Sequence, residues 1–186
     1  VNELVHDCGP VGTGARAYLD ATIRTPTYRS CYRSANWLAF VSGAYGSAAA
    51  SWLDLSRPLN GAARAVLQDL GRMKRLIESL PVGHHYLAPD GRHLVMGQGH
   101  LGTRSRSGHL YVSYFRGPVP AGEVTVELTE GRYLAQWIDP TSGEVLSETR
   151  HLLRRTGERA FVSLESPHVD EDAVLAIHNE AAIVVR

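Results

Sequence analysis

The chain of 186 residues has little cysteine and almost no lysine. Its two cysteines, Cys8 and Cys31, are too few for a disulfide scaffold and lack the C-x-x-C spacing of a metal or redox site. We favour two buried thiols that act as small hydrophobic residues, although the sequence leaves a Cys8–Cys31 pair open. Lys74 is the only lysine, so arginine supplies nearly all of the positive charge.

Net charge is also absent, because 19 basic residues balance 19 acidic ones. Such a chain has no bulk attraction for nucleic acid or for an anionic membrane, so we expect neither partner. No apolar run reaches the roughly 18 residues that span a bilayer, and no signal peptide is recognisable. We therefore expect a soluble protein, and the sequence does not indicate where in the cell it works.

Helical periodicity begins in the first half of the chain. The spacing predicts a helix over Thr27 to Val41 that stops at Gly43. Its expected buried face combines side chains three and four residues apart: Tyr28, Cys31, Tyr32, Ala35, Leu38, Ala39 and Ser42.

A second apolar stripe predicts a helix from Gly61 to Leu80, which Pro81 ends. Short runs at Val1 to Val5 and at Ser47 to Leu53 precede the two helices and are interpreted as strands. Strand, helix, strand, helix is the order of a parallel α/β layer. Parallel strands need neighbours on either side, so residues 1–82 are expected to be one piece of a larger layer. Either other chain segments complete this layer, or it packs on the second half of the chain.

After Gly83 the hydrophobic period changes to two, which is typical of strands. Eight runs follow it: His93 to Met96, His109 to Phe115, Glu123 to Leu128, Arg132 to Ile138, Glu144 to His151, Ala160 to Leu164, Ala173 to His178 and Ala181 to Val185. The sequence Asp139-Pro-Thr-Ser-Gly143 predicts a hairpin turn. The expected fold is α+β overall, with an α/β segment at 1–82 followed by an antiparallel β-sandwich at 83–186.

Three phrases resemble the carboxyl-terminal end of a retaining glycoside hydrolase with a (β/α)8 barrel and an appended β-sandwich, a small domain that has been labelled collagen-binding. Tyr28 to Gly46 is similar to the seventh barrel helix and its turn into the eighth strand. Gly131 to Glu144 is similar to an aromatic sandwich strand that runs into Asp-Pro-x-x-Gly, and Ser166 to Ile177 to the closing strand. The resemblance implies that residues 1–82 are the last units of the barrel.

The resemblance also implies a sugar site at the carboxyl ends of the barrel strands. Glu3 would stand at the position of the catalytic nucleophile, and His6 would line the same pocket. Trp52 would form the aromatic floor under a pyranose, and Asp54 would bind sugar hydroxyls. If the strand assignment is wrong, Asn2-Glu3 is instead the Asn-Glu pair of the acid/base. One carboxylate cannot perform a double displacement, so the chain alone is expected to be inactive.

Other chemistries lack their motifs. His84 and His85 are adjacent, which in an extended strand puts them on opposite faces, and no H-E-x-x-H or Cys/His cluster occurs, so we expect neither a metal nor a cofactor. No P-loop, dinucleotide-binding or G-x-S-x-G motif is present. Five aromatic residues of the predicted strands could line a sugar-binding stripe, but a core role is favoured. They are Tyr111, Tyr114, Phe115, Tyr133 and Trp137.

The favoured hypothesis is therefore the carboxyl-terminal portion of a glycoside hydrolase that acts on carbohydrate. The rest of its barrel is expected as another chain or as missing sequence. The alternatives are a non-catalytic module that binds carbohydrate or protein, and a stand-alone α+β domain of unrelated activity. The sequence also leaves a homo-oligomer open.

Overall fold

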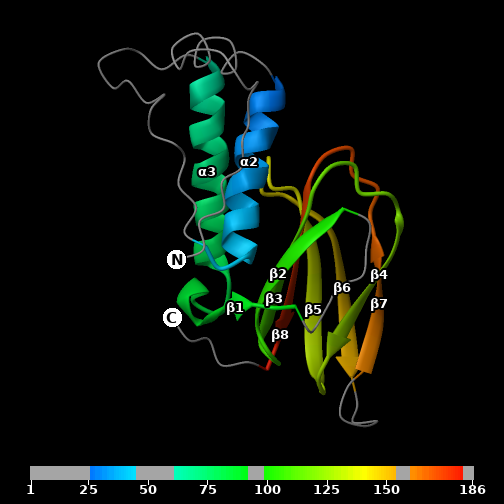
Figure 1. Ribbon diagram of the computed structural model, residues 1–186. Coiled ribbons are helices and arrows are strands. Elements are labelled where there is room, and N and C mark those ends of the chain that lie inside the picture. The colour runs from blue at the N-terminus through cyan, green and yellow to red at the C-terminus, as the bar shows by residue number, and fades with distance from the viewer. Residues whose placement is uncertain (1–25, 45–60, 92–98, 154–159, 182–186) are drawn as a thin grey trace.

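The computed structural model describes residues 26–44, 61–91, 99–153 and 160–181. Two long helices lie side by side on one side of a β-sheet (Figure 1). Helix α2 covers Pro26–Val41 and helix α3 covers Gly61–Ser79, each within one residue of its predicted bounds. Neither is long and apolar enough to cross a membrane.

The end of α2 is closed by a glycine in the left-handed region, as predicted. Gly43 has a φ of 75°, and its N–H donates to the carbonyl of Phe40. The N–H of Ala44 donates to the carbonyl of Ala39, which completes the Schellman motif. Gly43 packs closely against the Pro89 ring.

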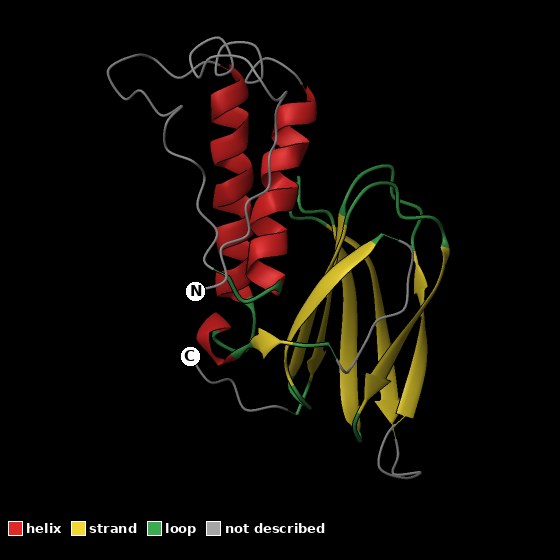
Figure 2. Cartoon of the chain, in the orientation of Figure 1, coloured by secondary structure: helices red, strands yellow, loops and turns green. Residues whose placement is uncertain are grey.

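The strands form one sheet of six and one of two (Figure 2). A 3-10 turn, η2, covers His84–Tyr86 and leads into the sheets. The strands are β1 Ala88–Pro89, β2 His100–Arg106, β3 Leu110–Phe115, β4 Gly122–Leu128, β5 Gly131–Ile138, β6 Val145–Leu153, β7 Ala160–Ser166 and β8 Ala173–Asn179. The large sheet has the order β1-β2-β3-β8-β5-β6, and β4 pairs with β7; all pairs are antiparallel.

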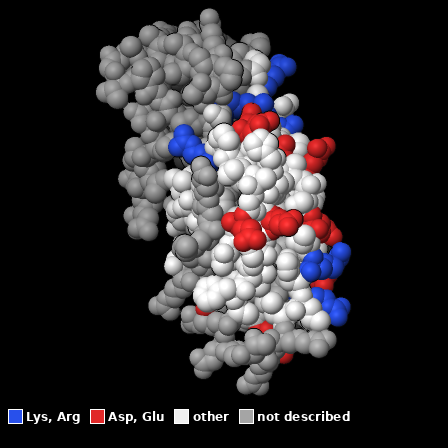
Figure 3. All heavy atoms as spheres, turned by 90° about the vertical axis from the view of Figure 1, so that its right-hand side faces the viewer, with Lys and Arg blue, Asp and Glu red and all other residues white. Residues whose placement is uncertain are grey.

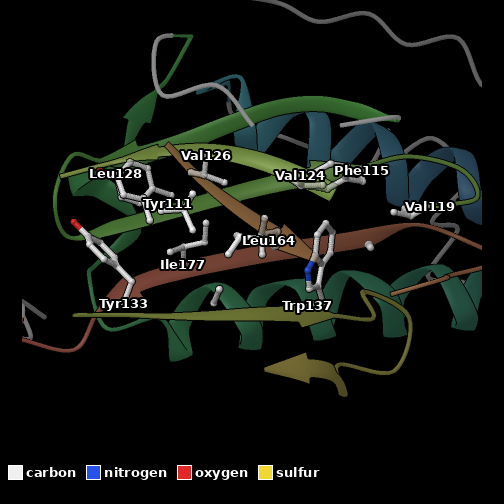
Figure 4. Packing of buried hydrophobic residues seen from close by; sticks show 14 residues of the cluster. Tyr111, Phe115, Val119, Val124, Val126, Leu128, Tyr133, Trp137, Leu164 and Ile177 are labelled. Atoms are coloured by element: carbon white, nitrogen blue, oxygen red, sulfur yellow. The ribbon is translucent and has the colours of Figure 1, made fainter. Parts of the chain in front are cut away.

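One hydrophobic core lies between the two sheets (Figure 4). Val126 on β4 and Leu164 on β7 face Tyr111 and Ile177 of the large sheet, and Trp137 closes one end. The indole N–H of Trp137 donates to the carbonyl of Glu165, so a polar contact ties the two sheets as well. Burial of apolar surface of this extent is the main term that stabilises the pairing.

A second core lies on the opposite face of the large sheet, under the helices. Trp37 of α2 stacks on Tyr114 of β3, with ring centroids 5.8 Å apart and planes 11° apart. Val41 continues the α2 contact, and Val112 and Val174 carry it across the sheet. Strands β3 and β8 are therefore buried on both faces, which explains their nearly continuous apolar sequences.

The predicted hairpin between β5 and β6 is confirmed. The N–H of Thr141 donates to the Asp139 carboxylate at 2.6 Å, and the N–H of Gly143 donates to the Asp139 carbonyl at 2.7 Å. Gly143 has the expected positive φ, 83°. Burial raises the pKa of Asp139, but the hydrogen bonds from Thr141 and Ser142 outweigh it and hold that pKa below its usual value.

Sequence reasoning missed strand β2. Its buried side chains are Thr103 and Ser105, whose hydroxyls bond to Ser113 and Asp90. A strand that buries hydroxyl groups shows no alternation of apolar residues, so the period-two test fails on it. Two predicted strands, His93 to Met96 and the part of Ala181 to Val185 beyond Ala181, lie outside the described residues.

The predicted face of α2 differs from the one that contacts the sheet. Trp37 and Val41 are buried there together with Arg33, whereas Ala35 and Leu38 of the predicted face are only half-buried. The helix is apolar on two faces, so periodicity alone selected the wrong one for this contact.

Helices together with a largely antiparallel sheet confirm the predicted α+β class. The predicted strands Val1 to Val5 and Ser47 to Leu53 lie outside the described residues. The barrel assignment of residues 1–82 and the boundary near residue 83 therefore stay predictions.

Replacing Gly43 by alanine should destabilise the protein by about 2 kcal/mol or more, because a Cβ is strained at its φ of 75° and would also clash with the Pro89 ring. Urea unfolding measures the change. Gly61→Ala is the matched control, since a Cβ there meets open space at the start of α3. Equal unfolding free energies for the two variants would contradict the role given to Gly43.

Candidate functional site

The four residues predicted to form the sugar site lie outside the described residues. They are Glu3, His6, Trp52 and Asp54. Cys8 lies there too, so its pairing with Cys31 stays open. The roles of these residues therefore stay predictions.

The aromatic residues of the sheet belong to the two cores, as favoured from the sequence. Tyr111, Tyr114, Phe115 and Tyr133 have no exposed surface, and Trp137 is almost completely buried. A sugar needs an exposed ring face to stack on. These five side chains are therefore excluded as a sugar-binding stripe in this conformation.

The two adjacent histidines do not occupy an extended strand. His84 and His85 begin the η2 turn, and their rings lie 5.7 Å apart in an edge-to-face arrangement. His85 also contacts the Tyr86 ring at 4.1 Å. In the part of the chain that the structure describes, no three His, Cys, Asp or Glu side chains are grouped so that they could hold a metal.

Three of the four buried charged side chains among the described residues meet where α2 lies on the sheet. Arg33, which is 4% exposed, donates from Nε to Asp172 at 2.9 Å and from Nη2 to Glu171 at 2.8 Å. Its Nη1 lies 3.5 Å from Asp69 of α3. One guanidinium thus joins both helices to the segment just before β8.

Asp172 is the acceptor at the centre of this cluster. Besides Arg33, it accepts a hydrogen bond from the Tyr114 hydroxyl at 2.7 Å and from the N–H of Gly117 at 3.1 Å. Burial and the Asp172 charge together raise the pKa of Tyr114 far above its usual value, so this phenol stays protonated. The carboxylate connects a helix, a strand and a turn.

Asp69 plays the corresponding part between the helices. Arg29 binds it through two nitrogens, at 2.7 Å and 2.6 Å, and Arg72 adds a third contact at 3.1 Å. Bidentate arginine–carboxylate pairs of this kind are among the strong ionic contacts in proteins.

Burial lowers the pKa of Arg33, but Asp172 and Glu171 outweigh it and raise that pKa overall.

The chemistry open to this cluster is limited. Its three arginines face three carboxylates, and each of these groups has a partner within the cluster. A general base or a nucleophile needs a lone pair that can reach a substrate. The cluster is therefore structural, and the sequence signal for it is Arg33, placed four residues before Trp37 and eight before Val41 on one helix face.

A groove of about 460 Å³ opens between the helices and the η2 turn. Its apolar lining includes Phe40, Leu70, Met73 and Ile77, and its polar lining includes His84. No sequence motif marks this groove, because its walls come from four separate segments. Its polar lining also includes Lys74, Glu78 and Arg104.

No family model matches the sequence, and no curated protein matches it. Among solved structures, the chain is similar to one described as a glycoside hydrolase, with a TM-score of 0.55 and 16% sequence identity. The fold resembles part of that protein. The likeness covers 84% of this chain and 38% of the other, so the chain spans about two-fifths of the length of its structural neighbour. At this identity the likeness concerns the fold alone.

Replacing Asp172 by asparagine should lower the free energy of unfolding by about 3 kcal/mol, because Arg33 would keep its charge in a buried site with its main partner gone. Thermal and urea unfolding measure the loss. Asp170→Asn is the control: it removes the same charge two residues away at a side chain that is 95% exposed, and it should change stability by less than about 0.5 kcal/mol. Similar losses in both variants would contradict the cluster.

Acid should destabilise the protein through two histidines. Burial lowers the pKa of His100 and of His178 below the ordinary 6.5. The unfolded chain then binds more protons than the folded one, so stability is full above about pH 6.5 and falls as the pH drops toward the folded values. His100→Gln should flatten the stability profile between pH 7 and about 5, and His178→Gln should do the same. Profiles identical to that of the unmodified chain would rule out the two histidines.

Proposed function

We propose that this chain is the carboxyl-terminal portion of a retaining glycoside hydrolase. Residues 1–82 supply the last two strand–helix units of a (β/α)8 barrel, and the sheets that follow brace them. The substrate class is carbohydrate, and the reaction is hydrolysis of an O-glycosidic bond by two carboxylates.

The observation that carries this proposal is the direction of the helices. Arg29 near the start of α2 binds Asp69, and Phe40 near its end lines the same groove as Ile77 near the end of α3. The two helices therefore run the same way (Figure 1). Parallel neighbours that follow each other in sequence are the repeating unit of a (β/α)8 barrel.

The connection between the helices has the length that such a unit needs. Helix α3 has 19 residues, which is about 28 Å of axis. An extended return over that distance takes roughly 9 residues. The chain has 16 residues between Ala44 and Gly61, enough for the return and two turns.

Apolar surface on α3 supports a layer that continues. Leu67, Leu70, Met73 and Ile77 are only half-buried, and three of these side chains line the groove between the helices. In a barrel, this surface would be covered by neighbouring strands and helices. The matched glycoside hydrolase extends well beyond the part that resembles this chain, since the likeness covers 38% of it.

Within this proposal, Glu3 is the nucleophile and Trp52 forms the aromatic floor of the sugar site. His6 and Asp54 line the pocket, and the acid/base comes from the portion that this chain lacks. A glycosyl-enzyme forms when the Glu3 carboxylate attacks the anomeric carbon while the acid protonates the leaving oxygen. Water then hydrolyses the glycosyl-enzyme and releases the sugar, and the residue that acted as the acid in the first step acts as the base.

The alternative of a glycan-binding module has less support, because the predicted aromatic stripe is buried. Phe161 of β7 is 74% exposed, so its ring is the aromatic face on which a sugar would stack in such a module. Figure 3 views the molecule from the side of β4 and β7 and shows acidic side chains across the middle of this face and basic side chains along its edges.

Mixing the chain with a polypeptide that supplies the upstream barrel strands should produce hydrolysis of aryl glycosides, whereas the chain alone should give none. Glu3→Gln should reduce the restored rate by several orders of magnitude, because double displacement needs both carboxylates. Glu180→Gln is the control, since Asn179-Glu180 is the second Asn-Glu pair of the sequence. Full activity of Glu3→Gln, or no hydrolysis on mixing, would refute the proposal.

A further inference from the structure

Helix α2 covers one face of the large sheet, so the side chains on that face are buried in an interface and are not exposed to solvent. Leu110, Val112 and Tyr114 of β3 point to this side, together with Val174 and Ala176 of β8, and all five are essentially unexposed. Helix α2 contributes Trp37, Phe40 and Val41 to the same cluster. Without the helices, the sheet would present a contiguous apolar face to water, which stable monomeric domains avoid.

Polar groups at this interface also depend on both sides. Asp172 is buried and takes Arg33 from the helix, while Tyr114 is buried and donates to Asp172. Arg104 of β2 donates to the carbonyl of Phe40 at 3.3 Å and lies over its ring at 5.1 Å. Separation of the helices from the sheet would break the bonds of Arg33 to Asp172 and Glu171, and would leave the buried Asp172 carboxylate without its charged partner.

The two cores share their strands. Along β3, Leu110, Val112 and Tyr114 face the helices, whereas Tyr111 and Phe115 point to the opposite side and face β4 and β7. Strand β8 alternates in the same way. Loss of order in β3 on the helix side therefore also removes Tyr111 and Phe115 from the other core, and loss of order in β8 removes Ala173, Leu175 and Ile177.

We propose that the helix pair and both sheets unfold as one cooperative unit, and that the sheets are a built-in brace of the helices rather than a detachable accessory module. Arg33 is the positioning residue, since it fixes α2 to Asp172 and, through Asp69, α3 to α2. The identity of what is braced, a catalytic barrel, rests on the proposed function. The coupling itself does not.

Hydrogen exchange of the whole chain, followed by mass spectrometry over a series of urea concentrations, tests the coupling. Peptides from α2 and peptides from β4 and β7, which lie on the far side of the large sheet, should merge into one opening transition. In Arg33→Gln, exchange in both groups should accelerate by the same factor, on the order of a hundredfold or more.

Arg150→Gln is the matched control, because Arg150 also contacts two carboxylates, Glu148 and Glu180, but its side chain is 62% exposed. It should change exchange by less than about fivefold. If Arg33→Gln fails to fold, Tyr114→Phe removes one hydrogen bond from Asp172 without changing any charge, and the two groups of peptides should again accelerate equally.

Acceleration confined to α2 and α3, with β4 and β7 exchanging as in the unmodified chain, would overturn the inference and make the sheets an independent domain. This readout involves no sugar. A failure of the glycosidase assay with coupled exchange would refute the proposed function alone, and hydrolysis with uncoupled exchange would refute the brace alone.

Discussion

The buried carboxylate of Asp172 holds the architecture together. It accepts hydrogen bonds from Arg33 of helix α2, from the Tyr114 hydroxyl of strand β3 and from the N–H of Gly117 in a turn. A charge in such a site is tolerated only when its partners are in place, so α2 has one position on the sheet that satisfies it. The apolar contacts of Trp37 and Val41 provide most of the attraction, and the ionic cluster selects the register.

Strands β3 and β8 are buried on both faces, so they link the position of α2 on one side of the large sheet to the packing of the small sheet on the other. Because β3 and β8 supply side chains to both cores, the small β4–β7 sheet and the helix pair are coupled although they do not touch the same face. A two-stranded sheet is marginal by itself. Here it is stabilised by the large sheet, and the large sheet by the helices.

The same geometry bears on function. The charge cluster is fully paired and therefore has no group left for catalysis, and the sheet aromatics are enclosed in the cores. The fold is similar to part of a solved glycoside hydrolase at 16% identity, and this likeness concerns the fold alone.

Local patterns in the sequence were sufficient for both helices, the Gly43 stop, the Asp139 hairpin and six of the strands, because capping, turn chemistry and side-chain periodicity act between residues close in the chain. The sequence did not predict strand β2, because hydroxyl groups replace the apolar side chains that the alternating pattern requires. The sequence predicted the wrong contact face of α2, because two faces of this helix are apolar.

Only the tertiary structure decided the centre of the molecule. Arg33 and Asp172 are 139 residues apart, and nothing local to either indicates the other. The sequence determined which segments become helix and strand, since hydrogen bonding and periodicity are short-range. Which faces meet, and which charges are buried together, depends on packing and desolvation between distant segments, and these arise only when the chain has folded.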